Sequence, residues 1–430
     1  MAAAALISSV YLLLFQGSLL RRPTGVADFS SLKTHCEHVR PIHTNSFIER
    51  QDRLAQTLHS LGASAYIAEP GANGAYYANL SGSSWHLSER PLLLLITPTE
   101  NNGVVSGNVT ILTPAFESTR ARLLPIPSDT EIAFPEWAED ANPYQVAASA
   151  IPQLQSLSDG KIYVDGAMRN FVVDGLQQAV GPKVEVSSAP VEIRRLRERK
   201  TDEELEIMKC VNEVTVLAIR AVRRQMYIGI RESEARSMIR GALSAAGLVN
   251  LDSIVLFGPN AALPHGGGTD RELKEKDYVL IDCGGELFGY HSDVTRTFAL
   301  ETSSIPIEHL DLWDIVFDAQ AAAIAAAHNG TITSDVDRAA RLTIKSEGYG
   351  PYFTHRLGHG IGLEVHESPY LRGGSDDIIL TGHTFSDEPG IYIEGKVGVR
   401  LEDCFYIEAD GSPVFLTAGV GGQAGSPWEP

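Results

Sequence analysis

Two carboxylates interrupt stretches of sequence that otherwise have the composition of buried β-strands. Asp282 ends the apolar run YVLID, and Glu402 lies inside VRLEDCFYI. An isolated ionised carboxylate is too costly to bury, so such groups are paired or bind metal ions. Asp293, His359 and Glu388 lie in comparable contexts, in HSDVTRTF, HRLGHGIGLEVHE and FSDEPGIYI. These five oxygen and nitrogen donors predict a metal centre.

The length and charge of the chain limit the classes of protein to which it can belong. At 430 residues it is too long for one ordinary core, so two domains are expected. The hydrophobic content of 43% and the charged content of 21% are typical of a globular protein. The formal net charge of -19 argues against nucleic acid or an anionic membrane as the main partner, because both require basic patches.

The four cysteines lie far apart and show no CxxC spacing. Cys36, Cys210, Cys283 and Cys404 therefore predict neither a disulfide scaffold nor a zinc–thiolate site. Cys283 and Cys404 each lie within two residues of a proposed ligand, but an oxygen-rich site prefers carboxylates to thiolates. We interpret both as small apolar core residues.

The first 30 residues carry an ambiguous targeting pattern. Residues 2–20 are almost entirely apolar or small, and Arg21 and Arg22 follow them. This order does not match a cleaved signal peptide, in which positive charge precedes the apolar run, although the length could just span a bilayer. The segment predicts a protein that is secreted or membrane-anchored through its N-terminus, with a cytoplasmic protein as the alternative.

Two regions of different organisation follow. Residues 31–190 alternate helical and strand patterns, which predicts an α/β domain with a mixed sheet. Residues 191–430 combine long helical patterns with antiparallel strands, which predicts an α+β catalytic domain. Thr201 and Glu204 form a capping-box pattern at the start of the first long helix of this second region.

The segment around Asp282 and Asp293 has the pattern of a β-hairpin, which can bring two carboxylates side by side. Asp293, Thr295 and Thr297 alternate along the returning strand, so their side chains share one face. Two carboxylates so close repel each other, and divalent cations would relieve this. A hairpin with polar residues at its rim remains the alternative for this segment alone.

Three histidines, His355, His359 and His366, lie among glycines that permit close approach of the backbone. The glycine pattern matches neither a phosphate-binding loop nor a dinucleotide-binding fingerprint. Arg400 lies two residues before Glu402, so both side chains are expected on the same side of a strand.

The set of two aspartates, one histidine and two glutamates, in this order along the chain, resembles the ligand set of the pita-bread metallopeptidases. GPNAALPHG, IDCGG, SDVTRTF, HRLGHGIGLEVHE, EPGIYI and VRLEDC are similar to the motifs of the Xaa-Pro aminopeptidase and prolidase branch. The preceding domain is similar to the creatinase/prolidase N-terminal domain, most recognisably in YYANLSGSSWHLSERPLLLLI. The resemblance implies a pita-bread fold for residues 191–430.

The resemblance also implies a function and a role for each residue. It implies hydrolysis of the bond between an N-terminal residue and a following proline by a hydroxide that bridges two metal ions. Carboxylate-rich ligation favours Mn²⁺, with Co²⁺ or Zn²⁺ as substitutes. A peptide with proline at its second position is the implied substrate, and a homodimer is the implied assembly. The implied metal ligands are Asp282, Asp293, His359, Glu388 and Glu402, and the implied catalytic residues are His265, His366, Glu388 as proton shuttle, and Arg400.

Two other functions fit parts of this pattern. A creatinase-like C–N hydrolase shares the fold but needs no metal, and the presence of all five ligands argues against it. A pita-bread domain that binds a partner without catalysis would be expected to have lost ligands, and none is lost here. The sequence does not distinguish a dipeptidase from an aminopeptidase that takes longer peptides. It also leaves open the roles of His355 and Asp387.

Overall fold

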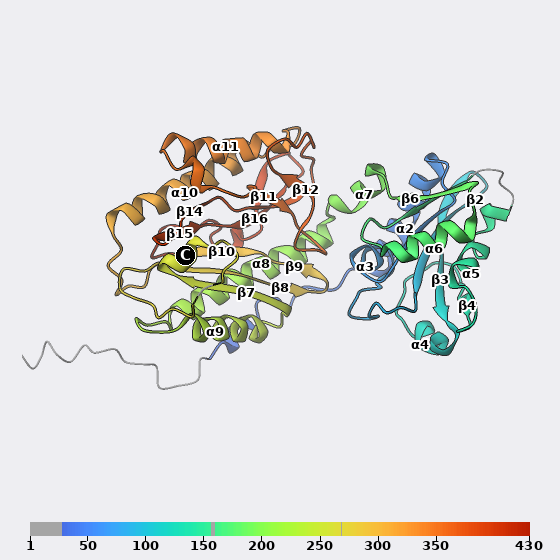
Figure 1. The fold of residues 1–430 in the computed structure, drawn as a ribbon, viewed down its shortest axis with the longest axis horizontal. Helices are drawn as coiled ribbons and strands as arrows, with labels where there is room; N and C mark the ends of the chain where they lie inside the picture. The colour runs from blue at the N-terminus through green and yellow to red at the C-terminus, as the bar shows by residue number, and fades with distance from the viewer. Residues whose placement is uncertain (1–27, 156–159, 268) are drawn as a thin grey trace, which may run out of the picture.

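A computed structural model describes residues 28–155, 160–267 and 269–430. They form two lobes that lie side by side (Figure 1). The first lobe contains residues 44–198, and the second contains residues 202–430 together with residues 28–40. The predicted targeting segment rests on residues 1–27, which lie outside the described residues.

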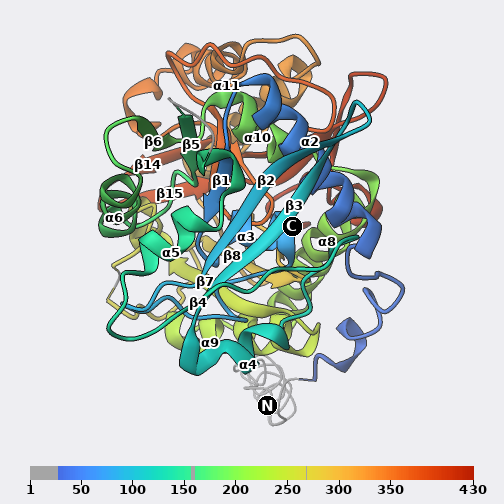
Figure 2. The ribbon, with the colours of Figure 1, turned by 90° about the vertical axis from the view of Figure 1, so that its right-hand side faces the viewer.

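The first lobe is built on a six-stranded mixed sheet with the order β4-β3-β2-β1-β5-β6. β1 pairs antiparallel with β2 and parallel with β5, and the long β2–β3 hairpin is prominent in Figure 2. Its strands are β1 (Ala65–Ala68), β2 (Leu93–Asn101), β3 (Val104–Pro114), β4 (Glu136–Trp137), β5 (Gly160–Val164) and β6 (Val184–Ser188). Its helices are α2 (Thr44–Ser60), α3 (Ala72–Ala78), α4 (Ser118–Arg122), α5 (Pro143–Ser149), α6 (Asn170–Val180) and α7 (Val191–Glu198).

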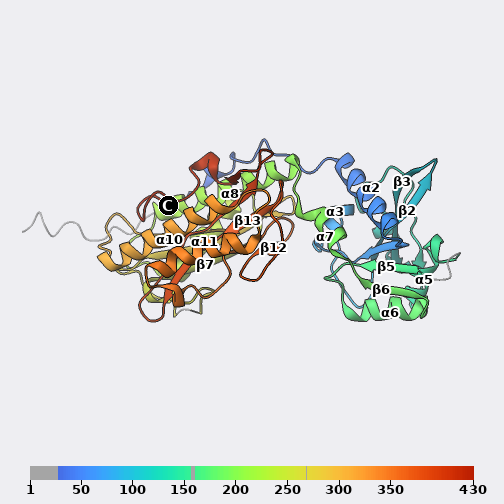
Figure 3. The same cartoon turned by 90° about the horizontal axis from the view of Figure 1, so that it is seen from above.

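Helices cover both faces of this sheet, because the side chains of β1 that point to either face are apolar. Tyr66 and Ala68 face the core under α2, whereas Ala65 and Ile67 face the core under α5 and α6. Figure 3 shows α2 and α6 on opposite sides of the strands. The predicted α/β class with a mixed sheet is confirmed.

The second lobe carries two sheets and two pairs of helices. The sheets have the orders β10-β8-β7 and β12-β11-β13-β16-β17, and β14 and β15 form a separate hairpin. The helices are α8 (Asp202–Arg223), α9 (Glu232–Ala245), α10 (Ile307–Ala326) and α11 (Thr333–Ser346). The strands are β7 (Val249–Phe257), β8 (Val279–Leu287), β9 (Tyr290–His291), β10 (Val294–Phe298), β11 (Gly358–Gly360), β12 (Glu367–Leu371), β13 (Thr384–Asp387), β14 (Gly390–Ile393), β15 (Val397–Arg400), β16 (Asp403–Ile407) and β17 (Pro413–Phe415).

Among the residues that the structure describes, one β-bridge joins the two sheets of the second lobe, between Thr295 and Glu402. The strands therefore follow one another across the lobe, from β7 through β8 and β10 to β16, β13, β11 and β12. α8 and α9 pack on the first sheet, and α10 and α11 pack on the second (Figure 1). This arrangement confirms the predicted α+β catalytic domain. α8 begins with the predicted capping box of Thr201 and Glu204.

Buried ion pairs connect the two lobes. Arg50 of α2 lies 3.4 Å from Glu204 of α8, and both side chains are almost fully buried. Lys200, just before α8, lies 2.5 Å from Glu367 of β12. Ile193 of α7 packs in the core of the first lobe, so α7 lies at the junction in Figure 1. The division of the chain at residue 190 stays a prediction.

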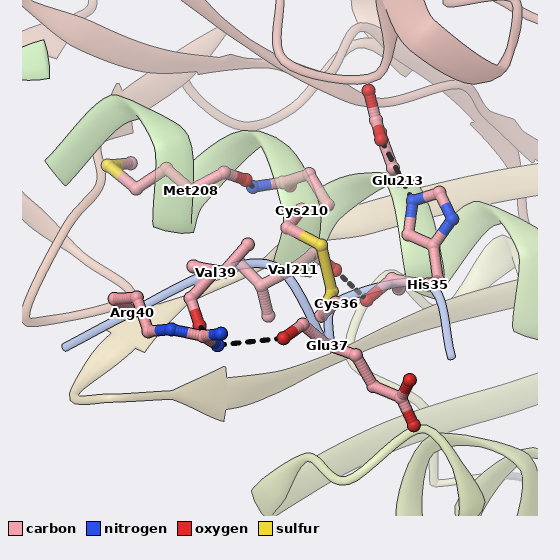
Figure 4. Close-up of a disulfide and its surroundings, with 11 residues drawn as sticks. His35, Cys36, Glu37, Val39, Arg40, Met208, Cys210, Val211 and Glu213 are labelled. Atoms are coloured by element: carbon pink, nitrogen blue, oxygen red, sulfur yellow. Dashed lines mark hydrogen bonds and ion pairs between the residues drawn. A yellow bond between two sulfur atoms is a disulfide. The ribbon is translucent and has the colours of Figure 1, made fainter. Parts of the chain in front are cut away.

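Residues 28–40 precede the first lobe in the chain but pack on the second. Phe29 and Leu32 join the core beneath α8 and α9. Cys36 forms a disulfide with Cys210 of α8, and the neighbouring His35 contacts Glu213 at 2.8 Å (Figure 4). The sequence interpretation that Cys36 and Cys210 form no disulfide is wrong. Their separation of 174 residues gives no local pattern from which the pairing could be predicted.

The prediction of a membrane anchor also needs correction. Along residues 28–155, 160–267 and 269–430, no helix combines the length and the apolar content that crossing a membrane requires. The apolar segment that led to the prediction lies outside these ranges, so the described chain gives the anchor no support.

Candidate metal centre

The five predicted ligands converge, although they come from five segments of the second lobe. Asp282 lies on β8, Asp293 precedes β10, His359 lies on β11, Glu388 follows β13 and Glu402 precedes β16. Potential ligand atoms lie within 4.8 Å of one another in three groups: Asp282, Asp293 and Glu402; His359, Glu388 and Glu402; and Asp293, His359 and His366. Asp293, His359 and Glu402 each belong to two groups, and Asp293 and Glu402 are the two that lie near both Asp282 and His359.

Strand pairing explains how the first two carboxylates meet. β8 and β10 are antiparallel, with Asp282 opposite Thr295 and Cys283 opposite Val294. Cys283 and Val294 face the core under α8 and α9. Asp282 therefore points to the other face of the sheet, away from that core. Thr295 also pairs with Glu402, which brings the third carboxylate to the same place.

The orientation of His359 presents a nitrogen lone pair to carboxylates. Its Nδ1 lies 3.1 Å from the carbonyl oxygen of Gly360, and this contact requires Nδ1 to be the donor. Nε2 has no hydrogen-bond partner within the described part of the chain, and it lies 3.3 Å from Glu388 Oε1 and 3.7 Å from Asp293 Oδ2. Either a proton or a metal ion must therefore lie between Nε2 and these oxygens.

The carboxylates also require positive charge among them. Burial raises the pKa of Asp282, and burial together with the neighbouring carboxylates raises the pKa values of Asp293 and Glu402 well above the ordinary range. Burial also tends to raise the pKa of Glu388, but the adjacent His359 imidazole lowers it to about 2 when a proton lies between the two groups. Oxygen and imidazole donors in this number suit divalent cations of the Mn²⁺ class, so the residues present fit a metal centre.

Arg400 organises the surroundings of two ligands. Its Nη2 donates to Asp282 Oδ2 at 2.6 Å, and its Nε donates to Thr295 Oγ1 at 3.0 Å. Thr295 Oγ1 in turn donates to Glu402 Oε2 at 2.6 Å. Arg400 is 3% exposed, so water screens none of these contacts effectively. Burial acts against its charge, but Tyr392 and Asp282 keep the pKa of Arg400 well above its usual range.

His355 contacts this network through a tyrosine. Arg400 Nη1 donates to the hydroxyl oxygen of Tyr392 at 3.0 Å, and that hydroxyl lies 2.9 Å from His355 Nε2. His355 Nδ1 lies 2.7 Å from the carbonyl oxygen of Arg356, so Nδ1 carries the proton and Nε2 accepts from Tyr392. His355 therefore supports Arg400 and does not belong to the ligand groups.

The ligands lie in the wall of a cavity with a volume of about 880 Å³. His265 and His366 also line it. The rings of His366 and His359 are 4.2 Å apart and nearly perpendicular. Burial and the neighbouring His359 lower the pKa of His366 to about 4, so its imidazole is neutral near pH 7.

Asp387 points away from this cavity, as expected for the strand neighbour of Glu388. It is fully buried, pairs with Asp403 across β13 and β16, and is absent from the cavity lining. Burial and the charge of Asp403 raise its pKa well above the ordinary range.

Sequence reasoning did not identify the roles of Thr295 and Tyr392. The alternation of Thr295 with Asp293 and Thr297 was a usable signal, because it places the hydroxyl on the ligand side of the strand. Tyr392 lies inside the apolar run GIYI, and its contact with His355 spans 37 residues. No sequence pattern indicated that contact.

Comparisons with known proteins agree with this geometry. The model of metallopeptidase family M24 matches residues 206–409. An uncharacterized peptidase of Schizosaccharomyces pombe is 40% identical over 395 residues, which cover 90% of this chain and 84% of that protein. A Xaa-Pro dipeptidase of Pyrococcus furiosus is 34% identical over 251 residues, which cover 58% of this chain and 71% of that protein.

Solved structures extend the likeness to the first lobe. The dipeptidase PepE of Mycobacterium ulcerans superposes with a TM-score of 0.78 at 29% identity, over 88% of this chain and 97% of that one. A prolidase of Thermococcus sibiricus gives a TM-score of 0.75 at 28% identity, over 88% of this chain and 98% of that one.

Proposed function

The chain belongs to metallopeptidase family M24, and we propose that it is a dinuclear-metal exopeptidase that cleaves the bond between an N-terminal residue and a following proline. The observation that carries the proposal is the lone pair of His359 Nε2, which faces Glu388 and Asp293 in the wall of the cavity. Family membership makes the chain a metallo-exopeptidase. The proline specificity and the number of metal ions are our proposal.

Five residues would hold the two ions: Asp282, Asp293, His359, Glu388 and Glu402. Asp293 and Glu402 would be shared, because each has a potential ligand atom within 4.8 Å of one from Asp282 and of one from His359. Mn²⁺ is our first choice, with Co²⁺ or Zn²⁺ able to replace it. Bound divalent ions lower the pKa of water, which supplies a nucleophile at neutral pH.

The other predicted residues would act on the substrate. Glu388 would carry a proton to the leaving nitrogen, because its carboxylate lies at the centre and also accepts from Ser386 Oγ at 3.2 Å. His265 and the neutral His366 line the cavity and would donate hydrogen bonds to the peptide. Arg400 would hold Asp282 and, through Thr295, Glu402 in place.

Two arginines support dipeptides as the substrates. Arg356 and Arg372 line the same cavity, and Arg356 Nε is buried without a hydrogen-bond partner. A free carboxylate on the proline would pair with guanidinium groups, whereas a longer peptide would place an amide there. The names of the relatives as dipeptidases and prolidases agree with this preference. A homodimer stays a prediction, which sedimentation of the full chain would test.

The test uses the full chain, stripped of metal and then supplied with Mn²⁺. We expect release of leucine from Leu-Pro only after Mn²⁺ is added, and slower release from Leu-Pro-Gly. His359→Ala is the matched variant, and it should lose both Mn²⁺ binding and turnover. If Mn²⁺ is bound and neither peptide is cleaved, the proposal is wrong.

A further inference from the structure

A row of side chains on β7 extends the cavity beyond the metal ligands. Ile254 and Asp252 alternate along the strand, so they share one face. Asn250 follows at an irregularity of the strand, where its φ is 48°, and all three residues line the cavity. Ile254 pairs directly with Asp282, and Asp252 pairs with Gly284, two residues further from the centre. Moving away from the ligands, the wall therefore offers an apolar side chain, then a carboxylate, then an amide.

Asp252 is an exposed carboxylate without a cationic partner among the described residues. Its Oδ1 accepts from the backbone N of Ser253 at 2.8 Å, which leaves most of the carboxylate available to the cavity. No lysine, arginine or histidine in the described residues forms an ion pair with it. Asn250 Nδ2 donates to Glu286 Oε2 at 2.6 Å, so a second acid lies behind this end of the row.

The opposite side of the cavity is basic. β7 and β12 are the outer strands of the two joined sheets, and the ligands come from the strands between them. Arg356 and Arg372 lie beside β12 and line the cavity there. A dipeptide across the ligands would therefore place its carboxylate toward β12 and its first residue toward β7.

Distance determines which group of the first residue meets Asp252. The α-amino nitrogen lies about 2.5 Å from the carbonyl carbon that is attacked, so it must stay beside the metal ligands. Asp252 is the diagonal neighbour of Asp282, and such positions lie roughly 7 Å apart. A lysine or arginine side chain spans roughly 6 Å, with an aliphatic stem that can lie along Ile254 and a charged end that reaches the carboxylate.

We propose that Asp252 selects dipeptides whose first residue is lysine or arginine. Ile254 contacts the stem of that side chain and Asp252 pairs with its cation. This specificity rests on the proposed function, because it concerns the same cavity and the same scissile bond. The hydrogen bond that Asp252 makes goes to Ser253 and not to a proposed metal ligand, but its charge contributes to raising the pKa values of Asp282 and Asp293. The test therefore uses the ratio of two substrates, in which an effect on the metal centre cancels.

The experiment compares two dipeptides that differ mainly in one charge, Lys-Pro and norleucine-Pro. We expect the wild-type kcat/KM to favour Lys-Pro by about two- to fivefold, the range of a solvent-accessible ion pair. Asp252→Asn should bring the ratio of the two kcat/KM values to about 1, and 0.5 M NaCl should reduce the ratio in the wild type. Asp376→Asn, which changes an exposed acid outside the cavity lining, should leave the preference unchanged.

A binding measurement separates this proposal from the proposed function. Calorimetry with lysine and norleucine, the amino acids released, needs no turnover. Tighter binding of lysine that disappears in Asp252→Asn supports the subsite even if neither dipeptide is cleaved. If both dipeptides are cleaved and the Lys-Pro preference is absent, or equal in Asp252→Asn, the subsite is wrong while the peptidase stands. If neither cleavage nor a lysine preference is found, both proposals fail.

Discussion

The hydroxyl of Thr295 lies 2.6 Å from Oε2 of Glu402, at the one bridge that joins the two sheets of the second lobe. The same hydroxyl accepts from Arg400 Nε at 3.0 Å. Its single proton is therefore directed at the glutamate, which fixes the position of one carboxylate oxygen. A substitution of Thr295 would therefore affect both the position of a metal ligand and the contact between the two sheets.

Thr295→Val keeps the shape of the side chain and removes the hydroxyl. We expect Mn²⁺ affinity to fall about 10- to 100-fold, because partners of metal ligands have effects of this size. Thr297→Val is the matched control, since Thr297 Oγ1 bonds only the backbone of Arg400 among the described residues. Calorimetric titration with Mn²⁺ checks the prediction, and equal affinities in the two variants would contradict it.

The disulfide between Cys36 and Cys210 should stabilise the folded protein, because it restricts the conformations that the unfolded chain can adopt. It closes a loop of 174 residues, and removing a natural disulfide lowers the free energy of unfolding by about 2–5 kcal/mol. We expect Cys36→Ala with Cys210→Ala to unfold at a lower urea concentration with peptidase activity retained. Adding a reductant should lower the urea concentration at which the wild type unfolds and leave that of the double variant unchanged.

His383 should make stability depend on pH. It is 2% exposed, and burial followed by the charges of Lys200 and Arg199 lowers its pKa from 6.5 to about 3. Between these values the unfolded chain binds the proton and the folded chain does not, so protonation favours unfolding as pH falls. Below about pH 6 this histidine should remove about 1.4 kcal/mol of stability per pH unit.

The check is the urea midpoint of the wild type and of His383→Asn between pH 7 and pH 4.5. The amide side chain of the variant binds no proton in this range, so the variant should have the shallower slope, whatever its stability at pH 7. Parallel slopes would show that the imidazole does not stay neutral in the fold.

The buried pair of Lys200 and Glu367 connects the junction of the lobes to the strand that follows His366. Lys200→Met leaves the Glu367 carboxylate with Arg197, whose Nη2 is 3.4 Å from Oε2. We expect the free energy of unfolding to fall by about 3 kcal/mol, near the lower end of the range for breaking a buried ion pair. Lys200→Met with Glu367→Leu should recover much of it, because the uncompensated charge is then absent. If the double variant is no more stable than Lys200→Met, the penalty does not come from that charge.

The sequence predicted elements whose cause is local. The capping box of Thr201 and Glu204 lies within four residues, and the helix that it begins is α8. The ligands could be identified because each carboxylate is conspicuous in its own apolar segment. The hairpin pattern predicted that Asp282 and Asp293 lie side by side, whereas the sequence placed Glu402 beside them only through resemblance.

Contacts between distant segments could not be predicted in this way. Arg400 and Asp282 are 118 residues apart, and neither segment specifies the other as its partner. The charges of Asp252 and Arg372 are also unremarkable in the sequence. Their roles follow from the strand order, which places Asp252 and Arg372 on opposite sides of the metal ligands in the cavity wall.

The bond between Cys36 and Cys210 encloses every residue of the first lobe in one covalent ring, because the chain leaves the second lobe after Cys36 and returns before Cys210. A protease that cuts anywhere in that lobe would therefore produce two polypeptides that remain one molecule. The cut would be visible on a denaturing gel only after reduction.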